Sequence, residues 1–177
     1  MIIMKAINIF ILLMFLVGFC CCDDEENIHV EEEGPRRDYD INSTDPVKKI
    51  VSEFFFNTGK EFIVDPDSSD YLYNFAEKNG VKMYPVSDTN RDYLLSTVQL
   101  IKSGFLDCYT TEFVKENFPY SVIIADTIYD TGTYLTPKIV DNIARINYYG
   151  VNVAGKANLD LAEQKAFLAL VHYDFFN

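Results

Sequence analysis

The stretch Ser121-Val122-Ile123-Ile124-Ala125-Asp126-Thr127-Ile128 is the most apolar strand that the sequence predicts, and it decides the fold class. Four consecutive apolar residues, Val122 to Ala125, leave this strand no polar face. Such a run is typical of a strand that is buried on both sides in the centre of a sheet. The turn residues Thr131-Gly132-Thr133 follow it. The rest of the chain must therefore supply a layer on each face of this strand.

Short helices and strands are expected before the central strand. Asp45 and Pro46 provide an N-cap and a first-turn proline for a helix that runs to Phe55. The acidic run 65–70 resembles a calcium loop, but its sixth position is not glycine and its twelfth is Ala76, which favours a helix N-cap cluster. Strands are predicted over 60–64 and 81–86, the latter with Val81 and Met83 on one face, and helices over 70–78, 90–103 and 110–117.

One or two strands and a long final helix are expected after it. The strand region covers 138–153. Asp160 and Glu163 have the spacing of a capping box, which begins a helix that continues towards Asn177. The run 166–171 is apolar all round, which predicts that this helix is buried. Residues 45–177 are therefore predicted to form one α+β domain with a mixed or largely antiparallel sheet.

Several blocks of this domain resemble one protein family. The blocks are Ser69–Phe75, Asn79–Tyr84, Val98–Lys102, Leu106–Tyr109 and Phe113–Pro119, followed by the strand at Val122–Ile124. Their order and spacing over residues 67–177 are similar to those of zinc-binding metallopeptidase lipoproteins associated with starch-utilisation-type nutrient import. The resemblance implies a zincin-like N-terminal lobe, with the C-terminal lobe missing from this chain.

The family's catalytic motif, His-His-Glu-Phe-x-His, is degenerate here. Two histidines four residues apart bind zinc, and the glutamate activates the bound water. The corresponding stretch matches the preceding histidine at His172 and the phenylalanine at Phe175. Tyr173 and Asn177 occupy the two ligand positions, and Asp174 occupies the general-base position. We expect no intact catalytic or metal site and no bound cofactor, although zinc is the family's metal. His172 is then an ordinary histidine near a helix C-terminus.

Charge and cysteine content exclude several classes of function. The chain has 27 acidic and 15 basic residues, a net charge of -12, and no basic patch, so nucleic acid is not an expected partner. Cys108 is the only cysteine outside positions 20–22, which excludes a disulfide framework in the domain. We expect Cys108 to be a small buried apolar residue. With His29 and His172 as the only histidines, a catalytic cysteine is not favoured.

The first residues predict export. Lys5 precedes an apolar run from Ala6 to Phe19, which is the layout of a signal peptide over residues 1–21. The alternative is an uncleaved anchor helix, for which the run is short. Three adjacent cysteines end the run and resemble a bacterial lipobox. Phe19 is bulky for the position before Cys20, whereas a small residue precedes both Cys21 and Cys22, and Cys22, which the acidic run follows directly, is favoured. We therefore predict a lipid anchor in the bilayer.

An acidic tether is expected to follow the cysteines. Asp23-Asp24-Glu25-Glu26 resembles the export tag of lipoproteins that are displayed on the outer face of the outer membrane. Residues 22–44 are highly charged and lack apolar periodicity, so they predict a disordered tether. The predicted location is the outer membrane, lipid-anchored and surface-exposed.

Three functions are compatible with these patterns. The first is a non-catalytic surface lipoprotein that binds a partner or a peptide or glycan substrate of an outer-membrane import complex. The second is an active zinc hydrolase of which this sequence is a truncated record. The third is an unrelated binding module in which tyrosines such as Tyr148 and Tyr149 contact glycans. Without a second lobe, Phe175 and Phe176 are expected to face solvent.

Overall fold

The computed structural model describes residues 36–72, 80–86, 91–132 and 136–177. One compact unit spans Asp38–Asn177, and the residues before Asp38 form a separate unit. The predicted signal segment, Cys20 to Cys22 and most of the predicted tether lie outside the described residues. The folded unit begins at Asp38 rather than at Asp45.

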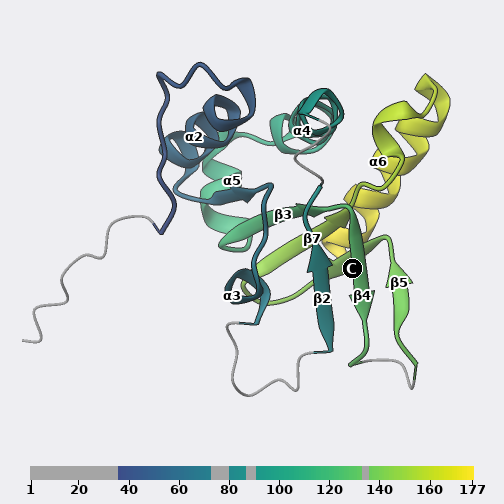
Figure 1. The fold of residues 1–177 in the computed structure, drawn as a ribbon. Helices are drawn as coiled ribbons and strands as arrows, with labels where there is room; N and C mark the ends of the chain where they lie inside the picture. Colours follow the sequence, from purple (N-terminus) through teal and green to yellow (C-terminus); the bar gives the residue numbers. More distant parts are fainter. Residues whose placement is uncertain (1–35, 73–79, 87–90, 133–135) are drawn as a thin grey trace, which may run out of the picture. The chain divides into compact units, whose positions relative to one another are not determined.

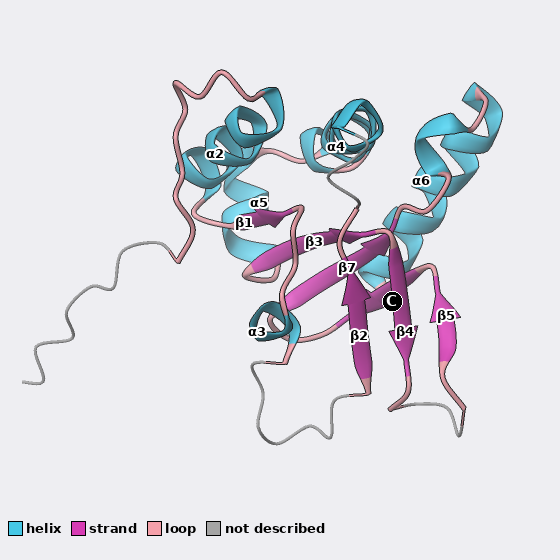
Figure 2. Cartoon of the chain, in the orientation of Figure 1, coloured by secondary structure: helices cyan, strands magenta, loops and turns pink. Residues whose placement is uncertain are grey.

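Two small sheets form the framework, and the fold is α+β as predicted (Figure 2). In the first sheet, of order β1-β3-β7-β6, the β1-β3 and β3-β7 pairs are parallel and the β7-β6 pair is antiparallel. The second sheet, of order β2-β4-β5, is antiparallel. The strands are β1 (Glu61–Ile63), β2 (Val81–Tyr84), β3 (Ser121–Ala125), β4 (Thr127–Asp130), β5 (Lys138–Val140), β6 (Asn142–Ala144) and β7 (Tyr148–Asn152).

β3 is central and buried on both faces, as its sequence predicts. Val122 and Ile124 face the helices, whereas Ile123 and Ala125 face the second sheet. The predicted strand 121–128 is in fact two strands, because β3 ends at Ala125 and β4 of the second sheet begins at Thr127. The region 138–153 likewise contains three strands rather than one or two.

Helices cover the other side of the first sheet (Figure 1). α2 (Pro46–Thr58) is capped by Asp45, and α5 (Thr111–Asn117) by Thr110. Asp67 caps the short α3 (Ser68–Tyr71) in a capping box with Asp70, which confirms the N-cap interpretation of the acidic run. The remaining described elements before the last helix are α4 (Arg91–Gly104) and the 3₁₀ turns η1 (Leu106–Cys108) and η2 (Lys156–Asn158).

The last helix, α6, spans Leu161–Phe176 and begins with the predicted capping box of Asp160 and Glu163. The prediction that it is buried all round is wrong, because it packs along one side only. Phe167 and Val171 are its buried residues, whereas Leu161, Leu170, Tyr173 and Phe176 are exposed. An apolar composition on both sides of a helix therefore does not ensure that both sides are covered.

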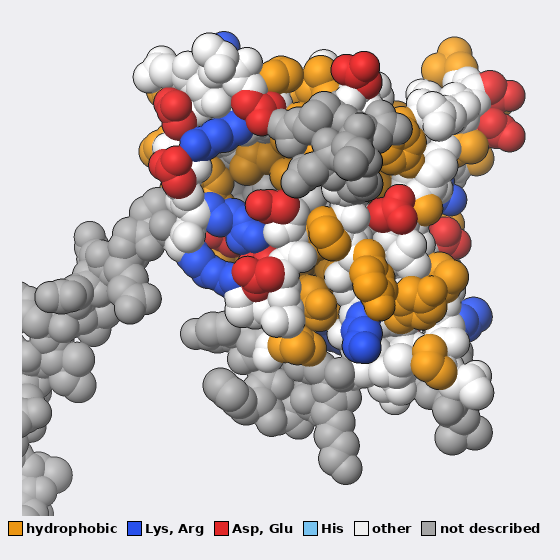
Figure 3. All heavy atoms as spheres, viewed as in Figure 1, with side chains coloured by type: hydrophobic (Ala, Val, Ile, Leu, Met, Phe, Trp, Pro, Cys, Tyr) orange, Lys and Arg blue, Asp and Glu red, His pale blue; other side chains and the backbone are white. Residues whose placement is uncertain are grey.

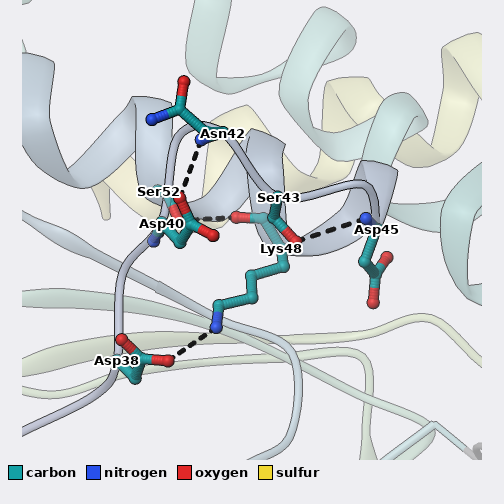
Figure 4. Close-up of polar contacts among 7 residues, drawn as sticks. All are labelled: Asp38, Asp40, Asn42, Ser43, Asp45, Lys48 and Ser52. Carbon is teal, nitrogen blue, oxygen red and sulfur yellow. Dashed lines mark hydrogen bonds and ion pairs between the residues drawn. The ribbon is translucent and has the colours of Figure 1, made fainter.

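A clasp of residues 38–45 on α2 explains why the folded unit begins early (Figure 4). The amide of Asp40 donates to Ser52 Oγ over 2.8 Å, and Lys48 Nζ lies 2.7 Å from Asp38 Oδ2. The Tyr39 ring stacks on Phe55 with centroids 4.1 Å apart. An aromatic stack supplies the apolar contact that the neighbouring charged residues cannot supply. The last part of the predicted tether is therefore packed.

The outer face of the second sheet is partly apolar (Figure 3). Tyr84 and Ile139 are exposed there, and the Tyr84 and Tyr129 rings meet edge to face, with their centroids 5.9 Å apart.

Among the described residues, no helix has the length and hydrophobicity needed to traverse a lipid bilayer.

Candidate functional site

An open groove of about 450 Å³ lies where the C-terminal end of α6 meets α5 and the turn between β6 and β7. Phe175 and Phe176 come from α6, and Ile146, which is 85% exposed, comes from the turn. Most of the lining is aromatic or aliphatic, with Asn117 and Arg145 as its polar members. The other lining residues are Phe113, Phe118, Pro119, Ala144, Tyr148 and Tyr149.

Aromatic packing forms the wall of this groove. The Phe175 ring lies 4.5 Å from Phe118 and 5.3 Å from both Phe105 and Tyr149, measured between centroids. These separations are in the range in which aromatic pairs attract beyond simple burial. Phe175 is thus a packed residue, and only Phe176, 60% exposed, faces solvent as expected. The expectation that both phenylalanines face solvent is wrong for Phe175.

His172 lies beside this wall, and both of its ring nitrogens are engaged. Nε2 donates to the Gly104 carbonyl oxygen over 2.9 Å, since a carbonyl can only accept. Nδ1 lies 2.6 Å from the Tyr109 hydroxyl oxygen. A metal ion could bind His172 only if one of these hydrogen bonds broke. The residue therefore anchors α6 to the end of α4 and to the segment after η1.

Asp174, at the general-base position, is also held in a structural contact. One of its carboxylate oxygens accepts from Asn142 Nδ2 over 2.8 Å.

Nearby, the buried Tyr149 hydroxyl donates to the Val171 carbonyl oxygen over 2.7 Å. Burial, together with the negative charge of Asp174, raises the pKa of Tyr149 far above its usual value near 10. The arrangement keeps Tyr149 protonated and bonded to α6.

The residues present do not fit a zinc site. The two ligand positions expected from the resemblance hold Tyr173, which is 65% exposed, and Asn177, whose amide donates to the Tyr173 carbonyl oxygen. Across the described part of the chain, no three His, Cys, Asp or Glu side chains are grouped so that they could bind a metal ion. Catalytic zinc sites use three protein ligands. No catalytic step through zinc follows from this arrangement.

Two further expectations are corrected by the structure. Cys108 is exposed rather than buried, because its 3₁₀ turn directs Sγ towards the Gly104 carbonyl oxygen, 3.4 Å away. Tyr148 and Tyr149 are both buried, so neither ring presents a face to a glycan. Both residues line the groove, which the sequence did not predict, because its residues come from three separate segments.

The chain matches no known protein family, no curated protein and no solved structure.

Proposed function

We propose that this chain is a non-catalytic, exported lipoprotein whose folded domain binds an apolar segment of a partner protein in the aromatic groove. The observation that carries the proposal is the groove itself, an open surface lined by six aromatic side chains. Binding sites of this kind combine apolar walls with a few polar groups that orient the ligand. Asn117 and Arg145 supply such groups here.

A binding role is preferred over hydrolysis because His172 and Asp174, the residues of the degenerate motif that carry ionisable side chains, are engaged in structural contacts. His172 and Asp174 hold α6 in place through Gly104, Tyr109 and Asn142. Descent from the import-associated zinc metallopeptidases is proposed on the sequence blocks alone. A location on the outer membrane, through a lipid on Cys22, Cys20 or Cys21, is proposed from the lipobox and the acidic run.

A peptide partner is preferred over a glycan because the groove is rich in phenylalanine and poor in hydrogen-bonding groups. A glycan presents many hydroxyl groups that would need partners, and burying them without partners is costly. An extended peptide can place an apolar side chain against Phe113, Phe176 and Ile146, with its backbone near Asn117.

Selection of displayed random peptides on the complete chain tests this proposal. We expect enriched sequences to contain aromatic or branched aliphatic residues. Ile146→Asp should weaken the best peptide at least tenfold, about 1.4 kcal/mol. Ile139→Asp, which adds the same charge at a 54% exposed isoleucine outside the groove, is the matched control. Equal binding by both variants would refute the groove as the site, and enrichment of hydrophilic peptides alone would refute the ligand class.

A further inference from the structure

The side of α6 that faces away from the domain carries a regular apolar stripe. Ala162, Ala166, Ala169, Tyr173 and Phe176 are all exposed, and they recur at intervals of four, three, four and three residues. This spacing is that of a coiled-coil seam. The buried residues Phe167 and Val171 lie on the opposite side of the helix. α6 therefore has two apolar sides, of which the domain itself uses one.

The order of residue sizes along the stripe is self-complementary in one direction only. The small residues occupy the first half, at 162, 166 and 169, and the large aromatic residues occupy the second half, at 173 and 176. When a second copy of α6 lies antiparallel and crosses at Ala169, Ala162 faces Phe176 of that copy and Ala166 faces its Tyr173. Facing small and large side chains interdigitate without voids or clashes. A parallel pair would instead place ring against ring and alanine against alanine.

We propose that two copies of this chain associate through α6, antiparallel about a two-fold axis at Ala169. An isologous interface of this kind uses the same surface on both copies and closes on itself. Exposed Tyr173, Phe176 and Leu170, with the three alanines, offer on the order of 600 Å² per copy, about the lower limit for a specific interface. Because the area is small, we expect a weak dimer, with a dissociation constant in the micromolar range.

Charge along the stripe is compatible with this partner despite the acidity of the chain. Between Leu161 and Phe176 the charged residues are Glu163, Lys165 and Asp174, so the helix is close to neutral. Asp174 is turned towards Asn142 and away from the stripe. At physiological salt, repulsion between charges farther apart than about 8 Å is largely screened.

Cysteine cross-linking on the complete chain, in a background in which Cys20, Cys21, Cys22 and Cys108 are replaced by serine, tests the geometry. We expect Ala169→Cys to form an oxidant-dependent covalent dimer, because residue 169 of one copy lies next to residue 169 of the other at the two-fold axis. Ala162→Cys should cross-link at least fivefold less, because an antiparallel pair separates those positions by about 20 Å. Equal cross-linking at both positions indicates a parallel pair and overturns the proposal, as does the absence of cross-linking at Ala169.

Sedimentation of the same chain supplies an independent measurement. Ala166→Glu should lower dimer formation at least tenfold, whereas Gln99→Glu, which adds the same charge to the exposed face of α4, should leave it unchanged. Circular dichroism and melting temperature will show that both variants are folded, since glutamate is a good helix former at exposed positions. A monomeric wild type at 100 µM would overturn the proposal. Ala162, Ala166 and Ala169 do not line the groove, so these variants leave its residues intact, and Phe176 is the residue of the stripe that also lines the groove.

Discussion

Two adjacent phenylalanines at the end of α6 have opposite environments, and their variants should differ accordingly. Phe175→Ser removes a ring that packs on Phe118, Phe105 and Tyr149, so we expect the free energy of unfolding to fall by about 2–4 kcal/mol. Phe176→Ser should cost less than about 1 kcal/mol and reduce binding of a hydrophobic dye. Urea unfolding and dye fluorescence provide the two measurements.

Phe56→Ser is the control for Phe176, because Phe56 is also 60% exposed but lies on α2. It should leave the dye signal from the groove intact. Similar losses of stability in the Phe175 and Phe176 variants would contradict the packing described for this end of the helix.

Tyr149 should make the folded state sensitive to alkaline pH. Its pKa is raised in the folded protein, chiefly by burial, so it keeps its proton where an unfolded tyrosine, with a pKa near 10, begins to lose its own. The free energy of unfolding should therefore fall as pH rises above about 10. Tyr149→Phe should be less stable at pH 8 by about 1 kcal/mol through loss of the bond to Val171, but should lose less stability between pH 9 and 11. The free energy of unfolding is measured by denaturant titration at each pH. If it falls equally between pH 9 and 11 in the wild type and in Tyr149→Phe, the assignment is contradicted.

The role of His172 shows what residue-level reading of a sequence can and cannot supply. The sequence predicts that the stretch around it holds no zinc, because Tyr173 and Asn177 occupy the ligand positions of the motif it resembles. Its partners Gly104 and Tyr109 are 68 and 63 residues away, and no local pattern indicates them. The prediction that Cys108 is buried was wrong for a related reason. Hydrophobicity favours burial, but it does not indicate the direction in which a 3₁₀ turn points a side chain.

At the scale of elements, the clasp of residues 38–45 on α2 should contribute measurably to stability. Tyr39→Ser removes the ring stacked on Phe55, and we expect a loss of about 1–2 kcal/mol in the free energy of unfolding. Ile41→Ser, at an exposed position of the same segment, should cost less than about 0.5 kcal/mol. Limited proteolysis should also cut the Tyr39 variant faster within this segment. Equal stability of both variants would mean that residues 38–45 do not stabilise the domain and belong to the tether.

Elements with local signals were predictable, and elements defined by their neighbours were not. The capping box of Asp160 and Glu163 and the first-turn proline Pro46 place helix starts correctly because they act within a few residues. The break at Asp126 was missed because it depends on β4 pairing with β2 and β5, which is a long-range contact. The sequence did not predict that one side of α6 is exposed. The solvent-facing side of a helix is usually recognised by its polar residues, and α6 has no distinct polar side.

At the scale of the whole molecule, the donor set predicts a protein that does not depend on zinc. The purified chain should contain less than about 0.1 equivalent of zinc, and a chelator should leave its melting temperature unchanged, because structural and catalytic zinc sites need three or four protein ligands. His172→Gln should not alter the metal content. One tightly held equivalent, lost in that variant, would show that ligands outside the described residues complete a site.

At the same scale, the lipid anchor proposed for Cys20, Cys21 or Cys22 predicts how the molecule is attached to a membrane. Lipoprotein processing adds a diacylglycerol and an amide-linked acyl chain, which exceeds the single chain that binds membranes only marginally. A clickable palmitate analogue should therefore label the wild type, and replacement of Cys20, Cys21 and Cys22 by serine should abolish the label and release the protein from the membrane fraction. Cys108→Ser is the necessary control, because Cys108 is exposed and could itself be acylated. Label that survives the triple replacement but disappears in Cys108→Ser would move the anchor to the domain, and label that survives both would exclude cysteine at these positions as the site.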